Sequence, residues 1–484
     1  MKKSPLLLNT VCAAAVVLLT ACASRPEPTI ADAQLPAVPQ SFSQAEGKWT
    51  ETAPAASAQR GAWWEAFEDT DLNRLVETAN RRNTEVAVSV ARLDAARAVI
   101  QATDAQRSLQ VGASASAGRG NAQATAPAAT SLTAGLSWSY ELDLSGRLSR
   151  SVDAAAFDTW AAEAALQSTR LGVQARVVQT YFALKALDEE AAIVAQTLNA
   201  YRDTLRLTER RHLAGDVASL DVARVRSEVA STEAESHALQ RQRYQLQTAL
   251  AVLVGETASK FGLVSSPWVS QLPLIPAGLP SEVLARRPDV SAAQQRLAAA
   301  QARAGVANRA WFPSVVLTGN GGYASSDLNN LFQWSARSWG IGMLLSTPLL
   351  DGGRREAERR VAAARFDESL AIYREQLLQA FKDVEDQLNA LNLLREQARA
   401  QAEAVTSAEE ATRLSTSRYN NGLVSHLELL DAQRSELRNR RQALQVRTAT
   451  FTATVSLIRA IGGSWDGAPG TRVVVRDDPS GHAR

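Results

Sequence analysis

The cysteine at position 22 has the clearest setting for covalent chemistry in this 484-residue sequence. It follows Leu19-Thr20-Ala21, and small residues before a cysteine are what the lipoprotein signal peptidase accepts, so this stretch resembles a lipobox. Lys2-Lys3 precedes an apolar run from Leu6 to Leu19, which is too short to span a bilayer and is typical of a signal peptide. We therefore predict a signal peptide over residues 1–21 and a covalent lipid on Cys22.

No other set of residues is arranged for catalysis. The four histidines are scattered, and none has a metal-binding spacing to another His or Cys: His212, His237, His426 and His482. No nucleophile motif is present. Gly319-Asn320-Gly321-Gly322 is rich in glycine but lies in an alternating, strand-like segment and opens no helix, which argues against a phosphate cradle. We expect no catalytic residue, no metal site and no cofactor besides the lipid, and therefore not an enzyme.

The charge balance argues against nucleic acid as a partner. The chain has 52 basic and 50 acidic residues, and removal of the two signal-peptide lysines leaves 50 of each. Cys12 would leave with the signal peptide, so the mature chain cannot form an internal disulfide. Ala23 stands where an aspartate would favour retention at the inner membrane of Gram-negative bacteria, which points to the outer membrane. Five prolines over residues 22–62 suit an extended tether.

Two segments alternate between apolar and polar residues as strands do. From residue 132 to 144 the even-numbered positions are apolar or aromatic, and most of the odd-numbered positions are polar. We predict β-hairpins over 108–144 and 313–350, whose strands have the length that a tilted strand needs to cross a bilayer. No segment after the signal peptide is apolar enough for a membrane helix, so any crossing must use strands. The alternation alone would also suit a soluble sandwich.

Four strands cannot close a barrel, and open strand edges are not tolerated in lipid. The chain must therefore oligomerise if its strands cross the membrane. Because barrels of about eight or more strands are known, this reasoning leaves a dimer, a trimer or a tetramer open.

Long helices are predicted over 147–213, 219–254, 353–420 and 425–461. Core-type residues recur there at alternating spacings of three and four, which is the coiled-coil repeat; in the first helix they are Leu184, Leu187, Ala191, Val194, Leu198, Tyr201, Leu205 and Thr208. Many of these positions carry small or polar residues, so the helices can pack along more than one face. At about 1.5 Å per residue, the first helix would measure on the order of 100 Å, enough for a column across the periplasm.

The chain is a tandem repeat at an offset of 204 to 207 residues. Ser145-Gly146-Arg147 aligns with Gly352-Gly353-Arg354, and Gly215 aligns with Gly422. We divide the chain into a first repeat at 63–255, an equatorial linker at 256–282, a second repeat at 283–462 and a C-terminal tail at 463–484. Each repeat consists of a helix, a hairpin, a long helix, a tight turn and a returning helix.

The motifs, in their order, resemble those of the TolC/OprM outer-membrane factors, and the lipidated NodT-type efflux lipoproteins most of all. The resemblance covers essentially the whole mature chain and rests on Trp63-Trp64, residues 141–147, Arg286-Arg287-Pro288-Asp289-Val290, Asp351-Gly352-Gly353-Arg354 and Arg418-Tyr419 before Gly422. It implies a mainly α fold with a membrane β part: an α-barrel of long coiled-coil helices, and two hairpins that contribute to a 12-stranded trimeric β-barrel.

In function, the resemblance implies a passive outer-membrane channel of a tripartite efflux system, with a large periplasmic part. Its partners would be two further copies of the chain, outer-membrane lipid, a periplasmic adaptor protein and an inner-membrane transporter that supplies the energy. A type I protein-secretion duct of the same fold is the alternative, and an envelope lipoprotein with coiled-coil spacers is a second. The transported substrate and the identities of the pump and the adaptor do not follow from the sequence.

The two turns between long helices are the candidate functional sites. In the family such turns form the narrow periplasmic end and meet the adaptor, so we expect docking and gating at Arg211–Ser219 and Arg418–His426. The residues are Arg211, Gly215, Asp216, Ser219, Arg418, Gly422, Ser425 and His426. The glycines would reverse the chain, and Ser219 and Ser425 would cap the next helices. Asp216 would either ring the entrance with carboxylates or be a solvated turn residue. His426 would be a pH-sensitive contact or, as we favour, an exposed histidine without a role.

Overall fold

The computed structural model describes residues 28, 35–39, 41–42, 61–121, 128–273, 275 and 280–463. The predicted signal peptide, Cys22, most of the tether, part of the linker and the tail beyond Gly463 lie outside these residues. The chain forms two compact units: Met1–Pro36, Ser89–Leu166 and Asp289–Gln376 make unit 1, and Ala37–Val88, Gln167–Pro288 and Leu377–Arg484 make unit 2. Each unit draws on both sequence repeats, so the repeats are not separate domains in space.

Unit 1 contains one antiparallel sheet in the order β1-β2-β3-β4. Its strands are β1 (Gln110–Gly120), β2 (Ala129–Leu142), β3 (Ser314–Ser325) and β4 (Arg337–Ser346), and pairing of β2 with β3 joins the two predicted hairpins. Short helices η5 (Leu328–Asn330) and η6 (Trp334–Ala336) lie in the second loop. Among the described strands, β1 and β4 each have one unpaired edge.

The register aligns side chains of one kind across the sheet. Val111 lies opposite Trp138, and Ala113 opposite Leu136, on the apolar face. On the other face Ser116 lies opposite Thr133, with their hydroxyl oxygens 2.8 Å apart. One face is therefore apolar across the strands and the other is mostly polar, as the alternation predicts.

The glycine run of β3 serves packing. A Cβ atom at residue 319 would collide with the indole ring of Trp138, which lies opposite it on β2. The missing side chain thus makes room for a tryptophan on the neighbouring strand.

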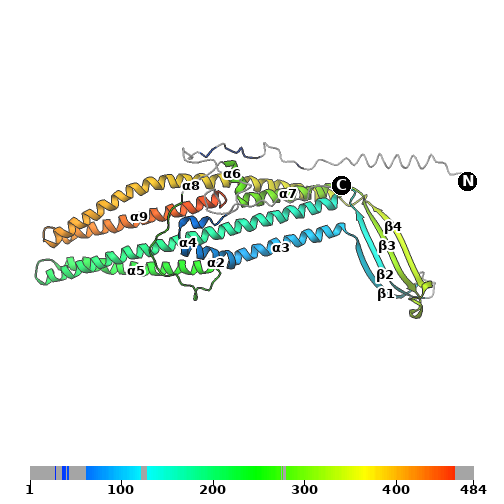
Figure 1. Cartoon of the computed structure of the whole chain (residues 1–484), viewed down its shortest axis with the longest axis horizontal. Helices are drawn as coiled ribbons and strands as arrows, with labels where there is room; N and C mark the ends of the chain where they lie inside the picture. The colour runs from blue at the N-terminus through cyan, green and yellow to red at the C-terminus, as the bar shows by residue number, and fades with distance from the viewer. Residues whose placement is uncertain are drawn as a thin grey trace, which may run out of the picture. The chain divides into compact units, whose positions relative to one another are not determined.

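Helices continue from every strand of the sheet. They are α3 (Thr84–Asp104), which reaches β1 through η4 (Ala105–Arg107), α4 (Arg147–Leu213), α7 (Pro288–Arg309) and α8 (Arg354–Asn420). Within unit 1 they lie side by side in the order α3, α4, α7, α8, the same order as the strands to which they connect (Figure 1). Unit 1 is therefore a single layer of helices continued by a single sheet.

Aromatic rings form the core of unit 2. Phe182 of α4 lies 5.0 Å from Phe67 and 4.7 Å from Phe451 between ring centroids, and Trp268 lies 4.8 Å from Phe451. The contributing elements are η3 (Trp63–Phe67), α4 and α9 (His426–Ala460), with α2 (Thr70–Arg82) and α6 (Pro280–Arg286) completing the N-terminal parts of the two repeats. This core joins segments that are almost 400 residues apart in the sequence.

A buried carboxylate organises the start of the first repeat. Asp69 caps α2 by accepting hydrogen bonds from the backbone amides of Asp71 and Leu72. It also accepts from the Tyr181 hydroxyl at 2.9 Å and from the Ser270 hydroxyl at 2.7 Å. One side chain therefore ties α2, α4 and the linker together.

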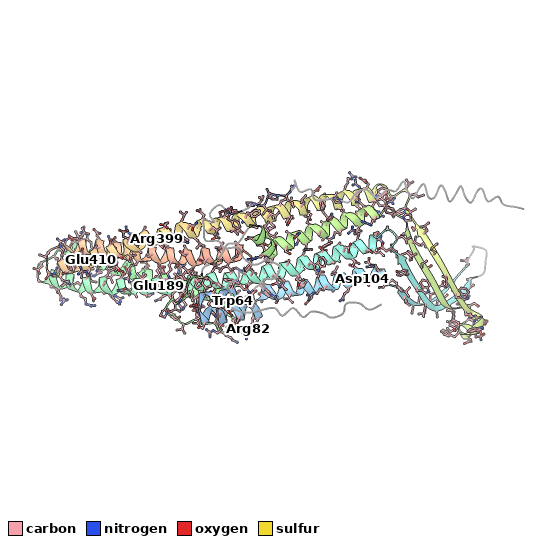
Figure 2. All side chains as sticks on the ribbon, turned by 45° about the horizontal axis from the view of Figure 1, so that its top comes forward. Trp64, Arg82, Asp104, Glu189, Arg399 and Glu410 are labelled. Carbon is pink, nitrogen blue, oxygen red and sulfur yellow. The ribbon has the colours of Figure 1, made fainter. Side chains whose placement is uncertain are left out.

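Two antiparallel helical hairpins make up the rest of unit 2: α4 with α5 (Ser219–Leu253), and α8 with α9. The coiled-coil positions of α4 are buried or half-buried, as the heptads predict. Ion pairs join the hairpins, because Arg441 of α9 pairs with Glu190 of α4 at 2.6 Å and with Glu235 of α5 at 2.5 Å. Arg447 likewise reaches Glu189 at 3.1 Å. Glu189 is labelled in Figure 2. Among the described helices, none combines the length and the apolarity that a bilayer crossing needs.

Candidate functional site

Both helical turns close with the same backbone geometry. The amide of Gly215 donates to His212 O at 3.0 Å, and the next amide donates to Arg211 O at 2.9 Å. In the second turn the amide of Gly422 donates to Tyr419 O at 3.0 Å, and the next amide donates to Arg418 O at 2.9 Å. This is the Schellman motif, and the glycines have φ values of 85° and 72°, which favour glycine. The predicted reversal of the chain at both glycines is confirmed.

The two turns meet within one chain through Arg211. Its Nη2 donates to Tyr419 O at 3.0 Å and to Asn420 O at 3.3 Å, and its Cζ lies 4.6 Å from the centre of the Tyr419 ring. The accepting carbonyls belong to the last turn of α8, where the helix dipole favours a cation. A hydrogen bond of 3.0 Å also links the hydroxyls of Thr208 and Tyr419, both of which are buried. We name this set, Thr208, Arg211, Tyr419 and Asn420, the tip contact.

The serines do not cap the returning helices as expected. Ser219 is the first residue of α5, the N-cap position belongs to Ala218, and no side chain bonds to the helix end. Ser425 does occupy the N-cap position of α9, but its hydroxyl makes no capping hydrogen bond. The turns are therefore held by their backbone bonds and by the tip contact.

The position of His426 contradicts the preference for an exposed residue. Its side chain is 5% exposed, its Nδ1 lies 3.5 Å from Oδ1 of Asp221 on α5, and its buried Nε2 has no hydrogen-bond partner. Burial lowers the pKa of His426 below the ordinary value; the Asp221 carboxylate partly opposes this shift and Arg224 adds to it. The imidazole is neutral at neutral pH, and a proton would have to enter a buried site beside α5.

Charged side chains lie exposed on the outer surface of the turns. Arg418 forms an exposed ion pair with Glu428 at 3.2 Å. Asp216 is exposed, and its carboxylate makes no hydrogen bond or ion pair with the described residues. An exposed Asp216 in one chain is compatible with both predicted roles, a ring of carboxylates at the entrance or a solvated turn residue.

Sequence reasoning missed Thr208 as part of the site and assigned Tyr419 no role of its own. Tyr419 lies within the predicted turn Arg418–His426 and in a family motif, whereas Thr208 was only a coiled-coil position. A usable signal lies in the tandem repeat, because at an offset of 207 Tyr419 aligns with His212, so the two turns differ where the contact forms. In the part of the chain that the structure describes, no three His, Cys, Asp or Glu side chains are grouped to hold a metal ion.

Comparison with known proteins places these features in context. The sequence matches the model of the outer membrane efflux protein family over residues 75–256 and 279–463. Outer membrane protein OprJ of Pseudomonas aeruginosa is 34% identical over 427 residues, which cover 85% of this chain and 89% of OprJ. Cation efflux system protein CusC of Escherichia coli O6:H1 is 31% identical over 467 residues, 96% of this chain and 99% of CusC. The crystal structure of outer membrane protein VceC from Vibrio cholerae has a TM-score of 0.79 at 29% identity, covering 83% of this chain and 98% of VceC.

Proposed function

We propose that this chain, which belongs to the outer membrane efflux protein family, is the passive exit duct of a tripartite pump for small molecules. Its family membership makes it an outer-membrane component of an efflux system. The amphipathic four-stranded sheet, continued by a layer of long helices, is the observation that carries the proposal. The family consists of channel proteins, and we infer that this chain likewise catalyses no reaction and holds no cofactor other than lipid. An inner-membrane transporter would supply the energy.

We propose that three copies complete the duct. β1 and β4 each leave an edge that needs a partner strand in lipid, and three four-stranded sheets would give 12 strands. Native mass spectrometry of complexes extracted from outer membranes should give the mass of three chains. A monomer or a dimer as the only species would contradict closure of the barrel by three copies.

The lipid on Cys22 is a separate proposal, supported by the lipobox-like sequence before it. Mass spectrometry of the mature N-terminus should show Cys22 as the first residue, bearing acyl chains. The Cys22→Ser variant should remain unprocessed. An acyl-free N-terminus at another residue would refute the anchor.

We propose that the turns Arg211–Ser219 and Arg418–His426 dock the adaptor and close the duct. Leucines at the turns are exposed, Leu213 to 86% and Leu423 to 69%, and so offer apolar contacts to a partner. A photo-crosslinking residue at either leucine should capture the adaptor in cells, whereas one at the exposed Val99 of α3 should not. Equal capture at all three positions would refute docking at the turns.

Protein secretion through the same fold remains the competing function. The cell-free supernatant of a strain that lacks this gene should contain the same proteins as that of the parent strain. Loss of one exported protein, with no change in small-molecule export, would favour the secretion duct.

A further inference from the structure

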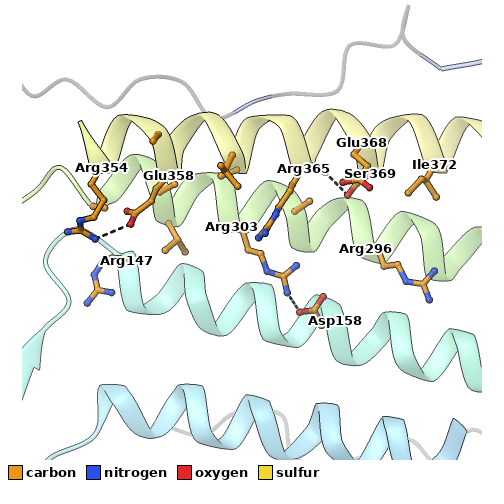
Figure 3. A pocket seen from close by; sticks show the side chains of 17 residues that line it. Arg147, Asp158, Arg296, Arg303, Arg354, Glu358, Arg365, Glu368, Ser369 and Ile372 are labelled. Carbon is orange, nitrogen blue, oxygen red and sulfur yellow. Dashed lines mark hydrogen bonds and ion pairs between the residues drawn. The ribbon is translucent and has the colours of Figure 1, made fainter. Parts of the chain in front are cut away.

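An arginine-rich groove lies on one surface of unit 1 and includes no residue of the turns. It has a volume of about 920 Å³ and is lined by α4, α7 and α8 (Figure 3). Its charged lining comprises five arginines and three acids: Arg147, Arg296, Arg303, Arg354 and Arg365, with Asp158, Glu358 and Glu368. The charged lining thus has a net charge of +2, or +1 when Glu141, the ion-pair partner of Arg147, is counted, which gives the groove a preference for anions.

Two of the five guanidinium groups are free to bind a ligand. Arg303 reaches from α7 to Asp158 on α4, and Arg354 pairs with Glu358 at 3.0 Å (Figure 3). Arg147 pairs at 2.7 Å with Glu141, which lies outside the groove lining. The guanidinium groups of Arg296 and Arg365, by contrast, make no hydrogen bond or ion pair with any residue that the structure describes.

Apart from Ser369, the rest of the groove is apolar. These side chains are alanines and branched aliphatic residues contributed by α7 and α8, such as Val306, Val361 and Ile372. The volume falls in the range of pockets that hold drug-sized ligands. A planar guanidinium binds a carboxylate, a phosphate or a sulfonate through paired hydrogen bonds. Free guanidinium groups above an apolar floor therefore suit an amphipathic organic anion.

The N-terminal segment shows which surface of the helix layer carries the groove. Leu35 packs against Leu297, Phe366 and Leu370, and the Gln301 amide donates to Pro28 O at 3.0 Å. Neither Leu297 nor Gln301 lines the groove. On α7 the groove residues recur at spacings of three and four and form another face, about 100° around the helix from Leu297. The groove thus opens on a different face of α7 from the one that Pro28 and Leu35 contact.

A lipid on Cys22 would determine which surface of the helix layer faces the lumen. Pro28 lies six residues after Cys22, so a lipid on Cys22 would hold Pro28 within roughly 20 Å of the bilayer and outside the duct. The groove would then face the lumen. Neighbouring copies would meet at the layer edges, α3 and α8. The groove lies mainly on α7 and α8, with Arg147 and Asp158 from α4, so only its α8 side adjoins such an edge and its α7 side remains open to solutes.

We propose that this groove binds amphipathic organic anions as they pass through the lumen, and so identifies them as a substrate class of the duct. The inference rests on the proposed duct, and on the proposed lipid at Cys22 for its lumenal placement. Three copies would present three grooves and six free guanidinium groups around the passage, which raises the local concentration of anions without any chemical step.

A matched pair of fluorescent probes tests the proposal. 8-Anilino-1-naphthalenesulfonate carries a sulfonate on the same aromatic body as the uncharged N-phenyl-1-naphthylamine. Binding of each probe is titrated to the full-length protein in phosphatidylcholine nanodiscs, with empty nanodiscs subtracted. The test variant is Arg296→Gln with Arg365→Gln. The control variant is Arg92→Gln with Arg438→Gln, which removes the same charge at exposed sites outside the groove.

The test variant should bind the sulfonate about tenfold more weakly, while its affinity for the uncharged probe stays unchanged and the control variant matches the wild type. If the test variant bound both probes more weakly to the same extent, the groove would be only an apolar patch and the proposal would be overturned. Unchanged binding of the sulfonate would also overturn it. The same preparations are examined in planar bilayers. Failure of the wild type to form pores would refute the duct itself, whereas pores without sulfonate selectivity would refute only the groove.

Discussion

The bond between Arg211 and the last turn of α8 is the contact whose loss should open the tip most directly. Replacement of Arg211 by alanine removes two hydrogen bonds to the carbonyls of Tyr419 and Asn420 and the stacking of the guanidinium on the Tyr419 ring. The turn itself should persist, because its own backbone bonds do not involve the arginine side chain. The change therefore loosens one hairpin from the other without unfolding either.

The expected magnitude follows from the contacts. Hydrogen bonds to a charged group contribute about 1.5–3 kcal/mol when shielded, and an exposed cation–π contact contributes about 0.5–1 kcal/mol. Because Arg211 is only half-buried, we discount the sum to about 2 kcal/mol per chain, which is roughly a 30-fold change in the ratio of closed to open tips.

Single-channel recordings in planar bilayers measure this ratio as open probability. Arg211→Ala should open far more often than the wild type. Arg210→Ala is the matched control, because among the described residues Arg210 bonds only to Arg206 O of its own helix. Equal open probability in wild type and Arg211→Ala, or an equal rise in the Arg210→Ala control, would refute the tip contact as the closure.

Three further perturbations follow. Because burial lowers the pKa of His426, an opened tip binds a proton more readily than a closed one, so the open probability should rise as the pH falls below about 6.5. The His426→Gln variant should not show this rise. The same pH profile in the variant and the wild type would contradict the role of His426. Gly319→Val should prevent assembly of heat-resistant oligomers, whereas Gly321→Val, which has free space, should assemble; equal yields would refute the packing argument. Asp69→Ala should destabilise the protein by about 3 kcal/mol, measured as a lower unfolding temperature, whereas Asp71→Ala should have little effect. Equal unfolding temperatures of the two variants would contradict the buried network around Asp69.

Local periodicity was sufficient to predict much of the fold. The alternation between residues 132 and 144 sets the face of each side chain, and the observed register of β2 against both neighbours keeps those faces. The spacing of three and four likewise identifies the buried stripe of α4. Gly215 and Gly422 follow from the need for a positive φ at a helix end. Each of these features depends on neighbours within one or two turns of the chain.

Features that depend on distant segments escaped prediction. The pairing of β2 with β3 joins hairpins about 180 residues apart, and the tip contact joins residues that are 208 apart. His426 belongs to a polar turn by sequence, but packing against α5 buries it. Serine is a common N-cap residue, but Ser219 is the first residue of α5, one position after the N-cap. A search for repeats also does not reveal the division into two compact units, because α4 and α8 each pass from one unit to the other.

The most direct test of the exit duct is the accumulation of small molecules in cells that lack the gene. Uptake of a panel of drugs, dyes, metals and detergents is measured in a strain without redundant channels, with and without a plasmid copy of the gene. We predict that at least one class accumulates in the deletion strain and returns to the parental level with the wild-type copy. Unchanged accumulation across the panel would contradict a role in efflux.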